Sequence, residues 1–269
     1  MIQSGKDARE LLAFYLDAGV DALLLEAPVD RFADDAAAPN AGAAVKAAPS
    51  PILAGAPPSA APPSADEALM AARTAAASAQ SLEELRALLA RFEGCMLRAT
   101  ATQLVFADGT PGARVMFVGE APGRDEDIAG VPFVGRSGKL LDLMMQAIGL
   151  DRAHAYIANV IPWRPPGNRT PTPQETAICL PFIRRQIELA NPDILVCLGQ
   201  PATQTLLGTK EGITRTRGRW FKYDTGSREI RALATYHPAF LLRSPLQKRL
   251  AWRDFLALKK ALRASAAAA

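Results

Sequence analysis

Residues 114–123 read RVMFVGEAPG, a short apolar run that ends at Gly119 and passes directly into a turn. Residues 193–199, DILVCLG, repeat the pattern, and residues 156–160 form a third apolar run. Each run is followed by a stretch with helical spacing: residues 139–148, 173–190 and 201–207. Buried strands that alternate with helices indicate a parallel sheet covered on both faces. With a further strand at residues 230–235, we expect a three-layer α/β/α sandwich around a central, mainly parallel four-stranded sheet.

Composition divides the chain into three parts. Residues 1–32 carry apolar side chains at helical spacing, whereas residues 33–80 are rich in alanine and proline. We expect a helical segment, then a flexible linker, and then one catalytic domain over residues 81–265. Ser81, with Glu84 three residues later, is expected to cap the first helix of that domain. The N-terminal segment carries no recognisable chemistry, so it is either a solubilising tail or a docking segment for a protein partner.

Charge and cysteine usage limit the class of protein. The formal net charge is +4 and the isoelectric point is near 9.1, which favours a polyanionic partner such as nucleic acid. The three cysteines are far apart in the sequence, which argues against a secreted disulfide framework. No signal peptide or long apolar span is visible. We expect a monomer of the bacterial cytoplasm, associated with the nucleoid and not with a membrane.

Polar and aromatic residues follow the expected strands, at the edge where parallel sheets place their sites. Glu120 directly follows the first of these apolar runs, Asn159 stands at the end of the third, and His237 follows the last strand. Phe133 lies in a loop rich in proline and glycine, which suits a stacking surface better than a core position. Each residue alone has a structural explanation, such as a cap or a turn. Together, an acid, an aromatic ring, an amide and an imidazole suit a planar, uncharged heterocycle.

Four motifs occur in a fixed order: GEAPGRDED at residues 119–127, GVPFVGRSGKLL at 130–141, NVIPWRPPGNRTP at 159–171 and HPAFLLR at 237–243. This order resembles family 4 of the uracil-DNA glycosylases, from about Cys95 to the C-terminal helix. The resemblance implies an enzyme that flips uracil out of DNA and hydrolyses its N-glycosidic bond, leaving an abasic site. Two alternatives stay open: a broader glycosylase acting on hypoxanthine, xanthine or mispaired thymine, and a non-catalytic reader of uracil-containing DNA.

The resemblance also implies roles for the pocket residues. Phe133 stacks on the flipped base, and backbone amides of the turn at Glu120 and Ala121 hold the uracil and the reacting water. Asn159 accepts from N3–H of uracil and donates to O4, so cytosine would leave buried polar groups unpaired. His237 donates to O2, where negative charge develops as the bond breaks.

The acid that positions the water is assigned less sharply. Glu126 is the first candidate and Asp127 the second, while Glu120 either does this or only braces the turn. A solvent-exposed acidic face is an equally good explanation of this run. DNA contacts are expected from a leucine wedge and from phosphate-binding arginines: Leu241 or Leu242, and Arg169 with Arg243.

The chain departs from the family pattern at the metal. Family 4 members hold an iron–sulfur cluster on four cysteines, but Phe92 and Trp163 occupy two of those positions here. Only Cys95 and Cys179 remain. We therefore expect no metal and no cofactor, with the two aromatic side chains filling the vacated volume.

Overall fold

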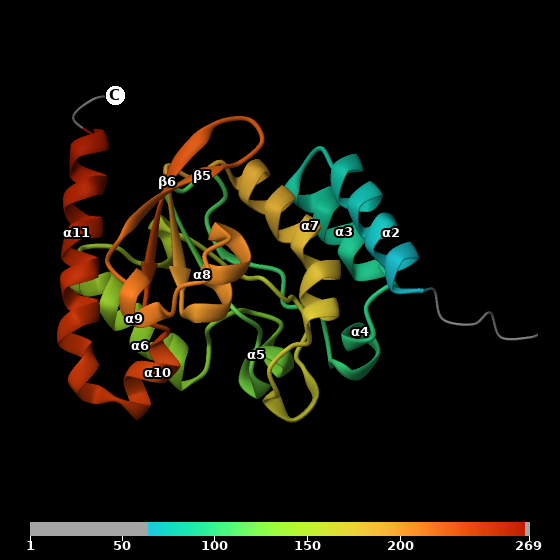
Figure 1. Ribbon diagram of the computed structural model, residues 1–269, viewed down its shortest axis with the longest axis horizontal. Coiled ribbons are helices and arrows are strands. Elements are labelled where there is room, and N and C mark those ends of the chain that lie inside the picture. Colours follow the sequence, from blue (N-terminus) through green and yellow to red (C-terminus); the bar gives the residue numbers. More distant parts are fainter. Residues whose placement is uncertain (1–63, 267–269) are drawn as a thin grey trace, which may run out of the picture. The chain divides into compact units, whose positions relative to one another are not determined.

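The computed structural model describes residues 64–266, which form a central sheet with helices on both faces (Figure 1). The sheet has six strands in the order β1-β3-β2-β4-β6-β5. In chain order these are β1 (Asp108–Gly109), β2 (Val115–Gly119), β3 (Tyr156–Asn159), β4 (Ile194–Leu198), β5 (Trp220–Asp224) and β6 (Glu229–Thr235). The expected parallel core of four strands is confirmed, because β3, β2, β4 and β6 pair in parallel. Two antiparallel edge strands, β1 and β5, were not predicted.

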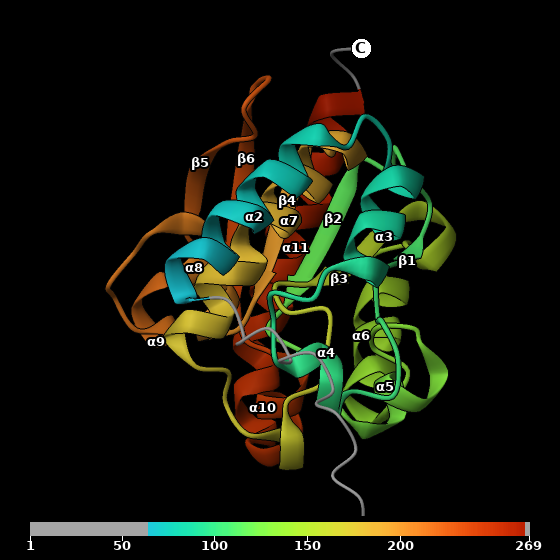
Figure 2. The ribbon, with the colours of Figure 1, turned by 90° about the vertical axis from the view of Figure 1, so that its right-hand side faces the viewer.

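The helices form the two outer layers. They are α2 (Ala65–Ser78), α3 (Leu82–Arg91), α4 (Leu97–Thr100), α5 (Arg124–Ala129), α6 (Arg136–Ala147), α7 (Pro173–Ala190), α8 (Gln200–Leu207), α9 (Ile213–Thr216), α10 (Pro238–Arg243) and α11 (Lys248–Ala266). Figure 1 shows α2, α3 and α7 on one side of the sheet and α6 and α11 on the other. The view in Figure 2 is turned by 90° and shows the strands running between these layers.

Alternation along the strands divides the core between these layers. In β2, Met116 and Val118 pack with α2, α3 and α7, whereas Val115 and Phe117 pack with α6 and α11. Every residue of β2, β3 and β4 is buried, as expected for strands covered on both faces. The apolar runs read from the sequence are therefore the inner strands of the sheet.

Helix α2 corrects the expected linker. Residues 65–78 were expected within a flexible stretch, but they form a helix that begins with a capping box between Ser64 and Glu67. Ala68, Ala72 and Ala76 are buried on its inner face and belong to the same core cluster as α7. Residues 65–78 therefore belong to the packed domain and not to a linker. The expected helical segment at residues 1–32 and the linker up to residue 63 lie outside the described residues.

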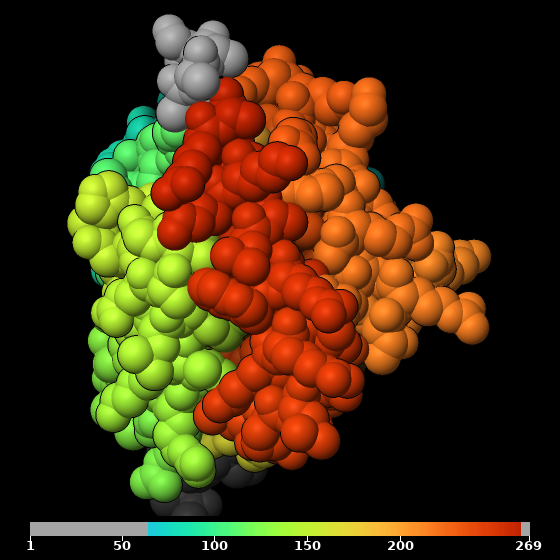
Figure 3. Space-filling view, turned by 90° about the vertical axis from the view of Figure 1, so that its left-hand side faces the viewer, coloured from blue at the N-terminus to red at the C-terminus, as the bar shows by residue number. Residues whose placement is uncertain are grey.

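Helix α11 covers the other face of the sheet, and Figure 3 shows it running along the whole of this side. A buried carboxylate ties it down, because Arg217 forms an ion pair with Asp254 of α11 and Thr235 Oγ1 donates to Asp254 at 2.8 Å. Within residues 64–266, none of the helices has the length and apolar character needed to cross a membrane.

The strand order fixes where a site can form. From β2 the chain crosses to β3 on one side and later to β4 on the other, so β2 is the point where the direction of winding reverses. In such sheets the crevice lies outside the carboxyl ends of the strands at this point. The register aligns those ends, since Gly119 pairs with Asn159 and Leu198 with Thr235.

Candidate active site

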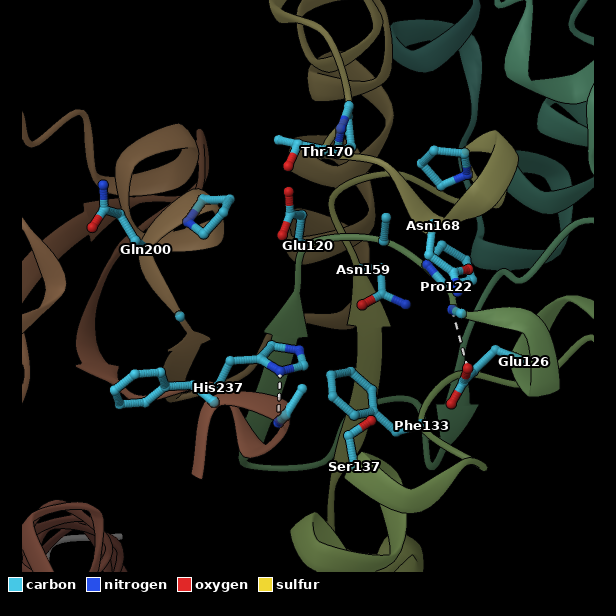
Figure 4. A pocket seen from close by; sticks show the side chains of 18 of the residues that line it. Glu120, Pro122, Glu126, Phe133, Ser137, Asn159, Asn168, Thr170, Gln200 and His237 are labelled. Carbon is cyan, nitrogen blue, oxygen red and sulfur yellow. Dashed lines mark hydrogen bonds between the residues drawn. The ribbon is translucent and has the colours of Figure 1, made fainter. Parts of the chain in front are cut away.

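A pocket of about 610 Å³ opens at the carboxyl ends of β2, β3, β4 and β6 (Figure 4). Eight of the residues singled out in the sequence line it: Glu120, Ala121, Glu126, Phe133, Asn159, Arg169, His237 and Arg243. In Figure 4, Asn159 lies between Glu120 and Phe133, and His237 approaches them from the last strand. The structure thus brings together the acid, the aromatic ring, the amide and the imidazole.

Asn159 ends β3 and presents an unsatisfied acceptor. The residue is only 4% exposed, and its Oδ1 has no hydrogen-bond partner among the described residues. A buried polar atom without a partner costs free energy, so such an atom at a pocket wall indicates a ligand donor. Gly119 makes this placement feasible, because a Cβ there would lie 2.5 Å from Asn159 Oδ1.

Phe133 is held in an unusual backbone conformation. Its φ of 56° lies in the left-handed region, which residues with a Cβ seldom adopt. The ring is 4% exposed, and its centroid lies 5.5 Å from that of the His237 ring. Gly138 lets the backbone approach closely, since a Cβ at Gly138 would lie 1.7 Å from Phe133 O. The ring therefore has one defined position at the pocket wall.

His237 is a partly buried imidazole at the pocket wall, with a pKa well below neutral pH. Burial, together with the nearby positive charge of Arg243, lowers the pKa of His237 to about 4. Ala239 N–H donates to Nδ1 at 3.1 Å, so Nδ1 is an acceptor and Nε2 carries the hydrogen. Gly199 at the end of β4 allows the close approach, because its Cβ would lie 2.9 Å from His237 Cβ. The site therefore holds an N–H donor without a positive charge.

The Glu126 carboxylate accepts three hydrogen bonds from backbone amides. Its Oε1 accepts from Val134 N at 3.0 Å and from Gly135 N at 2.9 Å, and its Oε2 accepts from Gly123 N at 3.0 Å. Although Glu126 lines the pocket, these bonds use its oxygens to join α5 to the loop of Phe133. This geometry disfavours Glu126 as the acid that holds a water.

Asp127 is equally engaged. The residue is 3% exposed, and its two oxygens accept from the backbone N–H and the hydroxyl of Thr102 at 2.9 and 2.8 Å. It does not line the pocket. Asp127 therefore supports the loop before β1 and is not placed to act on a ligand.

Glu120 is the acid that remains free. Within residues 64–266 no side chain or backbone group forms a hydrogen bond or an ion pair with its carboxylate. Glu120 directly follows β2 and lines the pocket. Burial raises the pKa of Glu120 above the ordinary value. A partly desolvated carboxylate without partners is suited to holding a water molecule.

The residues expected to contact DNA separate into two groups. Leu241 is 1% exposed and packs with Tyr236 and Ala251, so its placement in the core contradicts a role as a wedge. Leu242 is partly exposed. Arg243 lines the pocket and is exposed, whereas Arg169 forms a bidentate ion pair with Glu175 at 2.9 and 2.6 Å. The guanidinium of Arg169 is therefore paired with the first turn of α7.

Several pocket residues were not identified from the sequence. Gly199, Gln200 and Pro201 follow β4 and line the pocket, as does Ser137 at the start of α6. The signal for the first three was present, since residues 193–199 end in glycine in the same way as residues 114–119. Ser137 lay within a quoted motif but had no chemistry that distinguished it.

The cysteines do not fit a four-cysteine cluster. Cys95 and Cys179 are buried with their Sγ atoms 4.0 Å apart, and their hydrogen bond, with burial, raises the pKa of Cys179 well above its ordinary value. Phe92 and Trp163 are buried in the same core cluster. All cysteines and histidines of the chain are described, and within residues 64–266 no group of three or more candidate ligands is arranged to hold a metal ion.

A pocket lined by an amide, an imidazole and an aromatic ring at the carboxyl edge of an α/β/α sandwich suits an enzyme that recognises a planar heterocycle such as a nucleic-acid base. Sequence comparison makes this specific. The family model of the uracil DNA glycosylase superfamily matches residues 106–256, and the chain belongs to this superfamily.

Three relatives are each described as a type-4 uracil-DNA glycosylase. The protein of Archaeoglobus fulgidus is 39% identical over 180 residues, which cover 65% of this chain and 90% of the relative. That of Thermotoga maritima is 44% identical over 151 residues, covering 56% and 77%. That of Sulfurisphaera tokodaii is 38% identical over 185 residues, covering 67% and 84%. The expected closeness to family 4 is confirmed.

Proposed function

We propose that this protein is a monofunctional uracil-DNA glycosylase, which hydrolyses the N-glycosidic bond of a flipped uracil and so initiates base excision repair. The observation that carries the proposal is the pairing of two complementary groups in one pocket. Asn159 Oδ1 is a buried acceptor without a partner, and His237 Nε2–H is a donor without a charge. Uracil offers both a donor, N3–H, and an acceptor, O2, at neighbouring positions of one ring.

Asn159 selects the base. Its Oδ1 accepts from N3–H and its Nδ2 donates to O4, which satisfies the unpaired oxygen. Cytosine has an acceptor at N3 and an amino donor at C4. Asn159 Oδ1 would then face an acceptor and Nδ2 would face a donor, so neither hydrogen bond could form. Leaving buried polar groups unpaired in this way supports discrimination of about 10⁴-fold or more.

His237 stabilises the leaving group. As the glycosidic bond breaks, negative charge gathers on O2 of the uracil, and the Nε2–H of His237 donates to it. Because the imidazole is neutral, the transition state gains a hydrogen bond whose strength rises with the developing charge. Removal of one such donor typically costs about 10²- to 10³-fold in rate. The Phe133 ring fixes the plane of the base between these groups.

Glu120 serves the other side of the broken bond. The sugar becomes cationic as uracil leaves, so a carboxylate nearby stabilises it and orients the attacking water. Glu120 is unpaired at the pocket wall, whereas the oxygens of Glu126 are held by three amides. We therefore assign the water to Glu120 and give Glu126 a positioning role.

The DNA contacts follow from exposure. We assign the wedge that replaces the flipped base to Leu242 and a phosphate contact to Arg243. The protein would act as a monomer, because a pocket for a flipped base must face a long duplex. Its expected place is the bacterial cytoplasm, on DNA at the nucleoid. We retain the N-terminal segment, residues 1–32, as a candidate docking segment for a protein partner.

Base specificity is tested with matched oligonucleotides that carry one uracil, thymine or hypoxanthine, followed by alkaline cleavage of abasic sites. We expect cleavage of the uracil strand in the presence of a metal chelator. Ala121 and Pro122 line the pocket and place no large side chain there, so they offer little steric hindrance to the 5-methyl group of thymine, and the thymine strand tests whether that group is tolerated. Comparable rates on hypoxanthine or mispaired thymine would establish the broader glycosylase instead.

The choice of acid is tested by comparing Glu120→Gln with Glu126→Gln. We expect Glu120→Gln to slow single-turnover excision by about 10²-fold or more without lowering the melting temperature. Glu126→Gln should instead lower stability, because its amide group would face a backbone N–H. A normal rate for Glu120→Gln would contradict the assignment.

A further inference from the structure

Arg152 forms hydrogen bonds with the backbone of the loop that carries Phe133. Its Nη2 donates to Phe133 O, and its Nη1 donates to Pro132 O at 3.2 Å. The guanidinium is itself fixed by two carboxylates, since Nε donates to Asp142 Oδ1 at 2.8 Å and Nη1 to Asp108 Oδ2 at 2.5 Å. One side chain thus joins the loop to α6 and to β1.

The same loop is held from its other side by Glu126. That carboxylate accepts from the N–H groups of Val134 and Gly135, while Arg152 donates to the carbonyl groups of Pro132 and Phe133. Four consecutive residues are therefore held by an opposite pair of charges, the cation on the carbonyls and the anion on the amides. Charge-assisted hydrogen bonds of this kind are short and directional.

The loop needs such a clamp because its conformation is not favoured. Phe133 has a φ of 56°, which for a residue with a Cβ persists only where the surroundings impose it. The strain falls on the residue whose ring lines the base pocket, 5.5 Å from the ring of His237. A small rotation of this backbone would move the ring out of the plane on which the base stacks.

We propose that Arg152 is a positioning residue for base excision, which holds the Phe133 ring in register with His237 and Asn159. This rests on the proposed function. Arg152 does not line the pocket, so it touches neither the base nor the reacting atoms. Its effect on the reaction passes entirely through Phe133.

The structural alternative is that Arg152 only ties α6 to β1 through Asp142 and Asp108. The two explanations differ in their coupling to the ring. If Arg152 acts through Phe133, then its substitution matters only while the ring is present. If it supports the domain in general, the loss of rate is the same with or without the ring.

A double-mutant cycle separates them. We would measure single-turnover excision from a uracil oligonucleotide, together with melting temperatures, for Arg152→Lys, Phe133→Ala and the double variant. Lysine keeps the charge but cannot bind two carbonyls and two carboxylates at once. Because misplacement by about 1 Å can cost 10²-fold, we expect Arg152→Lys to slow excision by about 10- to 100-fold. In the Phe133→Ala background the further loss should be below about 3-fold, as coupled sites require.

The matched control is Arg185→Lys. Arg185 also donates to a backbone carbonyl, that of Ala79, and to a carboxylate, Glu188, but it lies on α7 away from the pocket. This variant should keep the wild-type rate. If Arg152→Lys does not fold, Asp142→Asn, which releases one anchor of Arg152, should give a smaller loss with the same dependence on Phe133.

Two results would overturn the proposal: an unchanged rate for Arg152→Lys, or an equal fold-loss in both backgrounds. A wild-type protein that leaves the uracil strand whole would instead overturn the proposed function. The two failures are therefore distinguishable.

Discussion

His237 predicts a specific dependence of stability on pH. In the unfolded chain its imidazole titrates near 6.5, whereas burial and Arg243 lower its pKa to about 4 in the folded protein. Between these values the unfolded chain binds a proton that the folded protein does not, so stability falls as the pH falls. The size follows from linkage: between about pH 7 and about pH 5 this residue alone removes about 2 kcal/mol, and about 3 kcal/mol once the folded form is protonated.

Other groups also contribute to the dependence of stability on pH, so a difference measurement is needed. Burial raises the pKa of Glu120 and of Asp254. A carboxyl group whose pKa is raised in the folded protein increases the free energy of unfolding as the pH falls, which is opposite to the effect of His237. His237→Asn keeps a side chain that can cap α10 and accept from Ala239 N–H, but it does not titrate. Urea unfolding of both proteins at about pH 7 and about pH 5 isolates the imidazole. The difference between the free energies of unfolding of the two proteins should change by about 2 kcal/mol from the higher to the lower pH. The wild-type protein should lose more stability than the variant.

If the difference in free energy of unfolding between the two proteins stays constant with pH, the reasoning is refuted, because His237 would then keep its ordinary pKa in the folded protein. The rate gives a second check. If the neutral imidazole is the donor, excision should show no inflection near 6.5 from this residue. A rate that falls as the pH rises through that value would show that the charged form is needed.

Three further predictions concern the pocket and the core. Asn159→Ala should slow excision by about 10²-fold yet leave the free energy of unfolding unchanged or higher, because it removes an unpaired buried oxygen; a lower free energy in urea unfolding would contradict this. Gly138→Ala should lower both melting temperature and rate, since its Cβ would lie 1.7 Å from Phe133 O, and a wild-type melting curve would oppose it. An iron chelator should leave the wild-type melting temperature unchanged, and Phe92→Ala should cost about 3–5 kcal/mol by opening a cavity; about four irons per chain would contradict the first part.

The sequence predicted the inner part of the fold well because the inner strands are continuous apolar runs. Helix α7 occupies the residues expected for it, 173–190, with a capping box at Thr172 before its first turn and Asn191 in the left-handed conformation after its last. The edge strand β5 was missed because it is short and only one of its five residues is buried, so its apolar signal is weak. Helix α2 was assigned to a linker because alanine contributes little apolar signal, although it is a strong helix former and allows close packing.

Most of the residues singled out in the sequence line one pocket, whereas their roles stay predictions. Order along the strands indicated Asn159, Phe133 and His237 because parallel strands bring their carboxyl ends together. Nothing in the motif distinguished the free carboxylate of Glu120 from that of Glu126. The two differ because folding brings backbone amides to the oxygens of Glu126 and not to those of Glu120. Leu241 is turned inwards by the short helix α10, which a linear motif does not reveal.

The most direct test of the central claim is excision of uracil from a labelled oligonucleotide by the wild-type protein and by Asn159→Ala and His237→Ala, with alkaline cleavage and a parallel binding assay. Arg185→Lys serves as the control outside the pocket. The structure predicts that wild-type protein and control cut only the uracil strand, and that both pocket variants lose about 10²-fold or more in rate while still binding DNA. A uracil strand that is bound by the wild-type protein but stays whole would contradict the claim and make the protein a reader of uracil in DNA.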